Sequence, residues 1–153
     1  MEKTGLENDK VNIEELLKEG HTVQVKPKGY SMYPLFVPGR DEAVIAPVKD
    51  NMCLKRGDVV LYRRRESMLV MHRIWKCRGD RFYLVGDNES RPEGPLSGEQ
   101  IKGILVGIVR KGKYFSVRQP MYRMLSGLWL ALRPLRPILS KAAAGGKRFL
   151  KIR

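Results

Sequence analysis

The distribution of hydrophobic positions divides the chain into a short helix, a strand-rich middle and a distinct end. Residues 12–20, NIEELLKEG, fit a helix, because Asn12 can cap it, acidic residues follow in its first turn and Gly20 ends it. Beyond it the apolar residues come in short runs separated by Gly, Pro, Asp and Asn. That pattern is typical of strands joined by turns.

Six such runs lie between residues 22 and 110: TVQVKP, EAVIAPV, DVVLYRR, MLVMHRIW, RFYLVGD and ILVGIVR. Gly79 and Asp80 suit the tip of a hairpin joining the fourth run to the fifth. Many short strands and few helices predict a mainly β, antiparallel, partly barrel-like domain. We therefore divide the chain into an N-terminal helical segment (1–21), a β-rich domain (22–117) and a basic, helical C-terminal tail (118–153).

The tail holds nine Lys or Arg and no Asp or Glu, so the net charge of +14 falls to +5 without it. Its apolar stretch MLSGLWLAL, between Arg123 and Arg133, is too short to cross a bilayer. A stretch with Trp129 bracketed by arginines suits the headgroup layer of an anionic membrane. The alternative is a terminal helix that docks on the β-domain. No nucleic acid is expected, since the tail does not alternate aromatic and basic residues.

Composition limits the remaining possibilities. A chain of 153 residues with 42% hydrophobic residues fits one globular domain. Cys53 and Cys77 give no disulfide framework and indicate free thiols in a reducing compartment, with a single bridge between them as the alternative. His21 and His72, the only histidines, are not at ligand spacing from a cysteine, so we expect no metal and no cofactor. Residues 1–20 resemble neither a signal peptide nor a membrane anchor, which predicts a cytoplasmic protein, free or attached to the inner face of the membrane.

Candidate chemistry centres on the segment KGYSMYPLFVPGRD, residues 28–41, where Ser31 lies in a Pro/Gly-rich bend. A serine there is ordinarily a turn residue, and it becomes a nucleophile only beside a base. His72 interrupts the apolar strand LVMHRIW and is either a satisfied core histidine or that base. Asp87 ends the next run and Glu93 follows it. Either acid can orient the histidine, which completes the set that acyl transfer requires.

Four motifs, YSMYP, RGDVVLYR, VMHRI and YLVGDN, resemble in this order the boxes of the signal peptidase I superfamily of serine endopeptidases, which includes the LexA-type self-cleaving repressors. The histidine in the third motif is similar to that of the archaeal and endoplasmic-reticulum Ser-His type. The resemblance implies a peptidase that removes leader or signal-like segments from precursor peptides by acyl transfer. Ser31 and His72 would be the catalytic pair, with Asp87 or Glu93 as the third member.

The resemblance also implies a groove that binds an extended substrate beside the serine. We expect Gly29 to let a peptide backbone come close, and the residues after the serine to contact the substrate. The expected substrate-binding residues are Gly29, Met32, Pro34, Leu35 and Phe36.

The chain departs from the family pattern in two places within the site. Gly29 occupies the position of a hydroxyl residue that often helps bind the oxyanion, so only the Ser31 amide is an evident donor. The acid after Gly-Asp-Asn is usually an aspartate, whereas this chain offers Glu93.

Two alternatives belong to other classes. A LexA-type self-cleaving regulator is disfavoured, because about 20 residues before the catalytic region are too few for a helix-turn-helix domain. Such proteins also tend to use lysine, and Lys76 and Lys102 are the candidates for a lysine base. A catalytically silent β-domain that binds a membrane or a protein partner through its tail is the non-enzymatic alternative.

Overall fold

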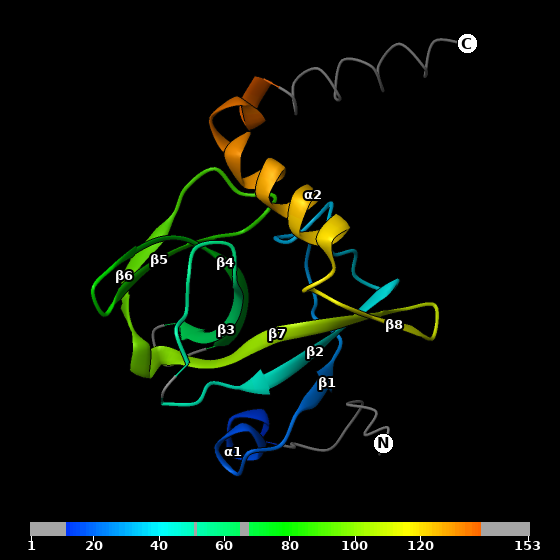
Figure 1. Ribbon diagram of the computed structural model, residues 1–153, viewed down its shortest axis with the longest axis vertical. Helices are drawn as coiled ribbons and strands as arrows, with labels where there is room; N and C mark the ends of the chain where they lie inside the picture. Colours follow the sequence, from blue (N-terminus) through cyan, green and yellow to red (C-terminus); the bar gives the residue numbers. More distant parts are fainter. Residues whose placement is uncertain (1–11, 51, 65–67, 139–153) are drawn as a thin grey trace.

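The computed structural model describes residues 12–50, 52–64 and 68–138 (Figure 1). Its strands are β1 (Val23–Val25), β2 (Asp41–Pro47), β3 (Val59–Arg64), β4 (Met68–Arg78), β5 (Arg81–Val85), β6 (Glu93–Ser97), β7 (Ile101–Arg110) and β8 (Lys113–Ser116). They form one sheet in the order β1-β2-β7-β3-β4-β5-β6, with β8 against β7. Every pairing is antiparallel.

The prediction of a mainly β, antiparallel fold is confirmed. Each of the six predicted runs overlaps a strand, and the turn between β4 and β5 lies at Gly79 and Asp80. β6 and β8 were not predicted, because EGPLS and KYFS lack an extended apolar run. Among the described strands, β1 pairs only with β2 and β6 only with β5, and the sheet is not closed into a barrel.

The central strands are buried on both faces. On β3, Val59 and Leu61 belong to one hydrophobic core, whereas Val60 and Tyr62 belong to a second. Side chains alternate along a strand, so a strand between two cores needs apolar residues at every position. This explains the uninterrupted run VVLY. It also means that neighbouring residues on β3 and β4 face different parts of the molecule.

Helix α1 (Ile13–Lys18) begins and ends as the sequence predicts. The Glu15 amide donates to the Asn12 side chain over 3.4 Å, and Gly20 has a φ of +89° after the last turn. Leu17 of α1 is 3% exposed and packs into the first core.

At the other end of the chain, α2 (Pro120–Ala131) runs across one end of the sheet, past the loop after β5 (Figure 1). A short 3-10 turn, η2 (Arg133–Leu135), follows it, and another, η1 (Gly98–Gln100), precedes β7. Within the part of the chain that the structure describes, no helix has the length and hydropathy needed to cross a membrane.

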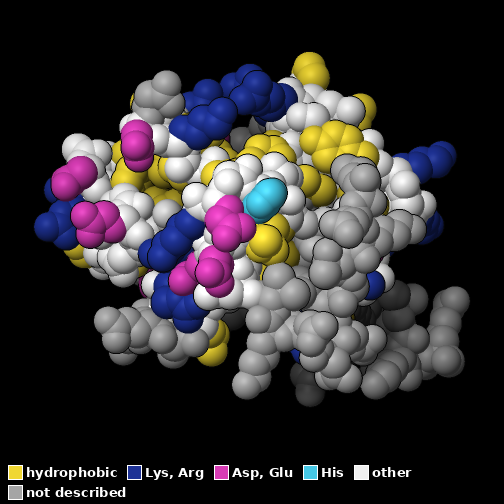
Figure 2. All heavy atoms as spheres, turned by 90° about the horizontal axis from the view of Figure 1, so that it is seen from below, with side chains coloured by type: hydrophobic (Ala, Val, Ile, Leu, Met, Phe, Trp, Pro, Cys, Tyr) yellow, Lys and Arg dark blue, Asp and Glu magenta, His cyan; other side chains and the backbone are white. Residues whose placement is uncertain are grey.

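The surface carries both signs of charge. The face in Figure 2 shows groups of acidic side chains among basic and hydrophobic ones. Cys53 is exposed, Cys77 is half-buried and both are free thiols. In residues 12–50, 52–64 and 68–138, no cluster of three or more His, Cys, Asp or Glu is arranged to hold a metal ion.

Candidate active site

The turn that carries Ser31 is anchored at the serine itself and at two residues after it. Met32 and Phe36 are 5% and 3% exposed and pack into the first core, and the Phe36 amide donates to the Met32 carbonyl over 3.0 Å. The Asn88 amide donates to the Ser31 carbonyl over 2.8 Å, which joins the turn to the loop after β5. Ser31 itself stays half-buried. Apolar anchoring and this backbone bond therefore fix the serine, while its side chain remains accessible.

His72 is almost fully buried on β4, with 1% of its surface exposed. Its Nδ1 atom lies 3.0 Å from the Tyr62 hydroxyl, and its Nε2 atom lies 3.6 Å from the Glu89 carboxylate. Burial lowers the pKa of His72, and the carboxylates of Glu89 and Glu93 offset only part of that effect. The imidazole is therefore neutral around neutral pH, as a general base must be.

Ser31 and His72 line the same groove, which has a volume of about 940 Å³. Glu89 and Asn88, from the loop after β5, line it as well. Much of the remaining lining is apolar, with basic side chains beside it. The apolar members include Val25, Leu61, Leu69, Val70 and Met71, and the basic ones are Lys26, Lys28 and Arg64.

The expected substrate-binding residues divide into two groups. Gly29, Met32 and Phe36 line the groove with Ser31. Pro34 and Leu35 are half-buried and lie outside the lining, and the Leu35 carbonyl accepts a hydrogen bond from Arg110 over 3.4 Å. The turn reverses direction after the serine, so only some of its side chains face the groove.

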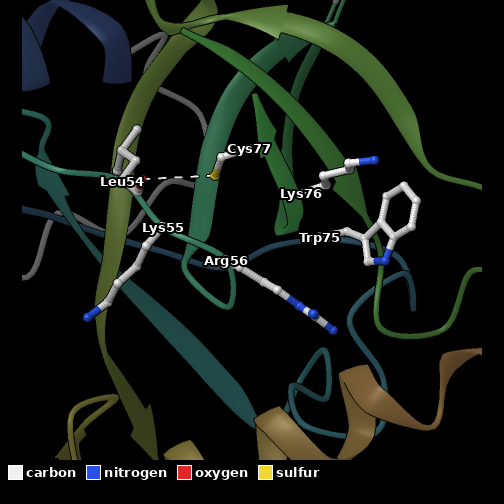
Figure 3. A pocket seen from close by; sticks show the side chains of 6 residues that line it. All are labelled: Leu54, Lys55, Arg56, Trp75, Lys76 and Cys77. Atoms are coloured by element: carbon white, nitrogen blue, oxygen red, sulfur yellow. Dashed lines mark hydrogen bonds between the residues drawn. The ribbon is translucent and has the colours of Figure 1, made fainter. Parts of the chain in front are cut away.

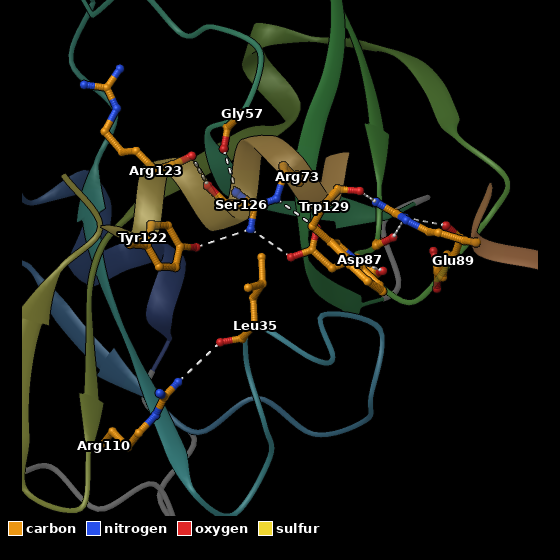
Figure 4. A network of polar contacts seen from close by, with 12 residues as sticks. Leu35, Gly57, Arg73, Asp87, Glu89, Arg110, Tyr122, Arg123, Ser126 and Trp129 are labelled. Atoms are coloured by element: carbon orange, nitrogen blue, oxygen red, sulfur yellow. Dashed lines mark hydrogen bonds and ion pairs between the residues drawn. The ribbon is translucent and has the colours of Figure 1, made fainter. Parts of the chain in front are cut away.

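The two candidate acids have different partners. Asp87 is fully buried, and both of its carboxylate oxygens accept hydrogen bonds of 2.8 Å from Arg73, the residue after His72 (Figure 4). Glu93, on β6, accepts a hydrogen bond from the Tyr62 hydroxyl and lies 3.7 Å from Nδ1 of His72. The geometry therefore favours Glu93 as the acid on the Nδ1 side of the histidine. Asp87 instead forms a buried ion pair with Arg73, which is a structural role.

Arg73 connects Asp87 to two other parts of the molecule. Its Nη1 donates to the Gly57 carbonyl over 2.8 Å, and its Nη2 lies 3.3 Å from the Tyr122 hydroxyl of α2. Burial alone would lower the pKa of Arg73, but the hydrogen bonds with Asp87 outweigh it and raise the pKa overall. A permanently charged Arg73 thus ties together the turn before β3, the loop after β5 and α2.

The described part of the tail docks on the loop after β5. The Trp129 indole donates to the Asp87 carbonyl over 2.7 Å (Figure 4). Arg136 donates to the carbonyls of Gly86 and Glu89 over 3.2 and 2.9 Å. Each of these bonds satisfies a backbone carbonyl of the loop that supplies Glu89 to the groove. The described part of the tail therefore holds the loop after β5 in place through these hydrogen bonds.

Sequence reasoning did not single out Tyr62 and Glu89. Glu89 directly follows Gly-Asp-Asn, and that position was its only signal. Tyr62 lies in an apolar strand and carries no local signal of a polar role. Its position near His72 follows only from the pairing of β3 with β4. Val60 pairs with His72 and Tyr62 with Val70, which places the tyrosine diagonally across from the histidine on one face.

A second hollow, of about 540 Å³, is lined by Leu54, Lys55, Arg56, Trp75, Lys76 and Cys77 (Figure 3). Burial raises the pKa of the Cys77 thiol, which opposes formation of a thiolate nucleophile.

The two lysines considered as alternative bases lie elsewhere. Lys76 lines this second hollow, and Lys102 donates to the Glu99 carbonyl over 3.0 Å. Neither lysine lines the groove with Ser31, so the geometry favours His72 over both as the base.

Comparisons with models of protein families, with curated proteins and with solved structures found no match to this chain. The assignment of a function therefore rests on the motifs and on the geometry of the groove.

Proposed function

We propose that this chain is a serine endopeptidase that removes leader or signal-like segments from precursor peptides through Ser31 and His72. One observation carries the proposal. The two residues lie 41 positions apart in the sequence and line one groove, and Nδ1 of the buried histidine is already engaged by a hydrogen bond. This arrangement leaves the other ring nitrogen for the serine.

The proposed reaction uses the groups in the order of ordinary acyl transfer. Nε2 of His72 takes the Ser31 hydroxyl proton as the oxygen attacks the scissile carbonyl. The resulting imidazolium gives this proton to the leaving amine, and an acyl-enzyme remains on Ser31. Water then attacks the acyl carbon and loses a proton to Nε2. The imidazolium returns this proton to the Ser31 oxygen as the ester bond breaks, and the acyl segment leaves as a carboxylic acid. Among the described residues the Ser31 amide donates no hydrogen bond, so it is available to the oxyanion.

The groove suits an extended peptide. In the described part of the chain β1 pairs on one side only, and Val25 of this strand lines the groove. An unpaired strand edge offers main-chain hydrogen bonds to a substrate strand, while pockets select alternate side chains. The apolar lining favours apolar side chains, and Lys26 and Lys28 favour substrates with acidic residues nearby.

A second candidate function, attachment to an anionic membrane surface, is favoured by the outer side of α2. The side of α2 that faces the protein includes Tyr122, Ser126, Trp129 and Leu130. The other side exposes large apolar residues at helical spacing: Met121, Met124, Leu125 and Leu128. An exposed apolar stripe on a helix with no acidic residue suits insertion among anionic headgroups.

The test of the peptidase is covalent labelling with a fluorophosphonate, which reacts with activated serines without a known substrate. We expect a single adduct on Ser31, located by mass spectrometry of the digested protein. Ser31→Ala should abolish labelling, and His72→Ala should abolish it nearly as completely, because members of such a unit fail together. Exposed Ser90 is the internal control and should stay unlabelled.

A folded wild-type protein without an adduct would refute the proposal and favour the silent β-domain. Labelled protein that cleaves itself, and no co-expressed precursor, would favour the LexA-type alternative.

A further inference from the structure

The Tyr62 hydroxyl lies between His72 and Glu93. It is 3.0 Å from Nδ1 of His72 and donates a hydrogen bond to the Glu93 carboxylate. Nδ1 itself is 3.7 Å from that carboxylate, beyond hydrogen-bonding distance. Glu93 therefore reaches the imidazole through the phenol. Tyr62 is 0% exposed and comes from β3, whereas Glu93 comes from β6.

Counting protons assigns the direction of each hydrogen bond. A phenol has one proton to donate and lone pairs with which to accept. Burial and the bond with Glu93 raise the pKa of Tyr62, so the phenol is neutral. Burial would raise the pKa of Glu93, but the bonds from Tyr62 and Arg64 lower it overall, so this carboxylate is ionised and can only accept. The phenol proton is thus directed to Glu93.

We propose that Tyr62 is the positioning residue that fixes the tautomer of His72: its oxygen accepts a hydrogen bond from Nδ1–H, while its own proton is held by Glu93. This leaves the lone pair on Nε2, on the side of the ring where Glu89 approaches to 3.6 Å and where the groove lies. The catalytic meaning of this inference rests on the proposed peptidase function, whereas the tautomer itself does not.

The chemistry balances without moving the tyrosine proton. When Ser31 attacks, its proton goes to Nε2, and the ring becomes an imidazolium that keeps its proton on Nδ1. Tyr62 stays neutral and accepts a stronger, charge-assisted hydrogen bond from the imidazolium. Glu93 contributes its negative charge through the phenol and does not itself become protonated. The positive charge that develops on His72 is stabilised at the moment when the base acts.

The tautomer can be measured directly, because the chain has only two histidines, His21 and His72. Protein labelled with ¹⁵N-histidine is examined at pH 8 by two-bond ¹H–¹⁵N correlation, and His21→Gln assigns the signals. We expect His72 to show a protonated Nδ1 and an unprotonated Nε2. Tyr62→Phe should remove this preference. A wild-type ring protonated on Nε2, or a tautomer that is the same in Tyr62→Phe, would overturn the inference.

A kinetic test separates positioning from simple structural support. Tyr62 does not line the groove, so Tyr62→Phe should lower the first-order rate of fluorophosphonate labelling of Ser31 and leave the half-saturating concentration unchanged. The expected loss is roughly 10- to 100-fold, a part of what general-base catalysis contributes. The pH midpoint of Ser31 labelling should also shift in Tyr62→Phe, because the Tyr62 hydroxyl is hydrogen-bonded to the imidazole of His72, whose protonation sets that midpoint. The other ionisable groups around that ring are those of Arg64, Asp87, Glu89 and Glu93.

Tyr83→Phe is the matched control, because it removes a hydroxyl on β5 that has no hydrogen-bond partner among the described residues. Glu93→Gln is the second variant, and it should weaken the tautomer preference even if Tyr62→Phe folds poorly. Equal labelling rates and pH profiles in wild type and Tyr62→Phe would refute the inference and leave the peptidase standing. A wild-type protein that is never labelled would refute the peptidase, and the NMR measurement would still decide the tautomer.

Discussion

The carbonyl oxygen of Ser31 lies so close to Gly86 that a Cβ atom added to Gly86 would be 2.6 Å from it. Such an approach is shorter than van der Waals contact, so any side chain at position 86 must displace the serine turn or the loop. The Asn88 amide bonds to the same carbonyl over 2.8 Å. Gly86 and Asn88 thus hold the turn that carries Ser31, which gives the Gly-Asp-Asn motif a role that does not involve the histidine.

Gly86→Ala should therefore lower the labelling of Ser31 by at least about tenfold, since displacements near 1 Å can cost two orders of magnitude in rate. Fluorophosphonate labelling measures the effect, and thermal unfolding reports on the fold. Gly127→Ala is the matched control, because the added methyl group has no atom within 4 Å and alanine suits the interior of α2. Labelling of Gly86→Ala at the wild-type rate would show that the serine turn does not depend on this contact.

The pair Arg73–Asp87 predicts a loss of stability. Both residues are almost completely buried, at 1% and 0% exposure, so neutralising one leaves the other charge unpaired. Asp87→Asn should lower the free energy of unfolding by about 3 kcal/mol, measured in urea. Asp80→Asn, at a side chain 90% exposed, is the control and should change it by less than about 0.5 kcal/mol. If Asp87 instead orients His72, Asp87→Asn would keep the wild-type free energy of unfolding and lose the fluorophosphonate labelling of Ser31.

The lowered pKa of His72 predicts the pH dependence of the proposed reaction. Only the neutral ring can accept the serine proton, so the labelling rate should rise with pH, with a midpoint below 6.5, and stay level above it. The same shift makes protonation favour the unfolded chain, so stability falls as the pH drops from 6.5 through the folded-state pKa. His21 is mostly exposed, and His21→Gln should leave the profile unchanged. A midpoint above 6.5 would mean that nearby carboxylates outweigh burial.

Much of the fold follows from local sequence, whereas the connections within the site do not. Continuous apolar runs such as VVLY and turn residues such as Gly79 predict strands and hairpins, because each signal lies within a few residues. Tyr62 looks like an ordinary core residue in the same run. The register of β3 against β4 places Tyr62 beside His72, and the position of β6 places Glu93 on the other side of the tyrosine.

The burial of Arg73 is a second feature that the local sequence could not predict. A basic residue in a strand is ordinarily exposed, yet this one is buried by a carboxylate 14 positions away and by Tyr122, 49 positions away. The motif that contains it suggested a catalytic histidine but gave no reason for the arginine. The reason is tertiary, and no pattern of spacing along the chain contains it.

The two expectations for the tail, docking and membrane attachment, use different sides of α2. Met124 and Leu128 lie one turn apart and are 66% and 56% exposed, while Trp129 and Leu130 face the protein. The double variant Met124→Glu/Leu128→Glu should therefore keep the fold and the labelling of Ser31. It should lose binding to vesicles that contain phosphatidylserine, because it places two carboxylates among anionic headgroups.

Co-sedimentation with vesicles of phosphatidylcholine, with and without phosphatidylserine, measures this binding. Lys113→Glu is the matched control, since it lowers the net charge by the same two units at an exposed position of β8 and should retain most of the binding. Wild-type binding should weaken in high salt, because charge attraction contributes to it. A double variant that binds as well as the wild type would exclude this side of α2 as the membrane contact. Equal losses in the double variant and in Lys113→Glu would mean that net charge alone drives the association.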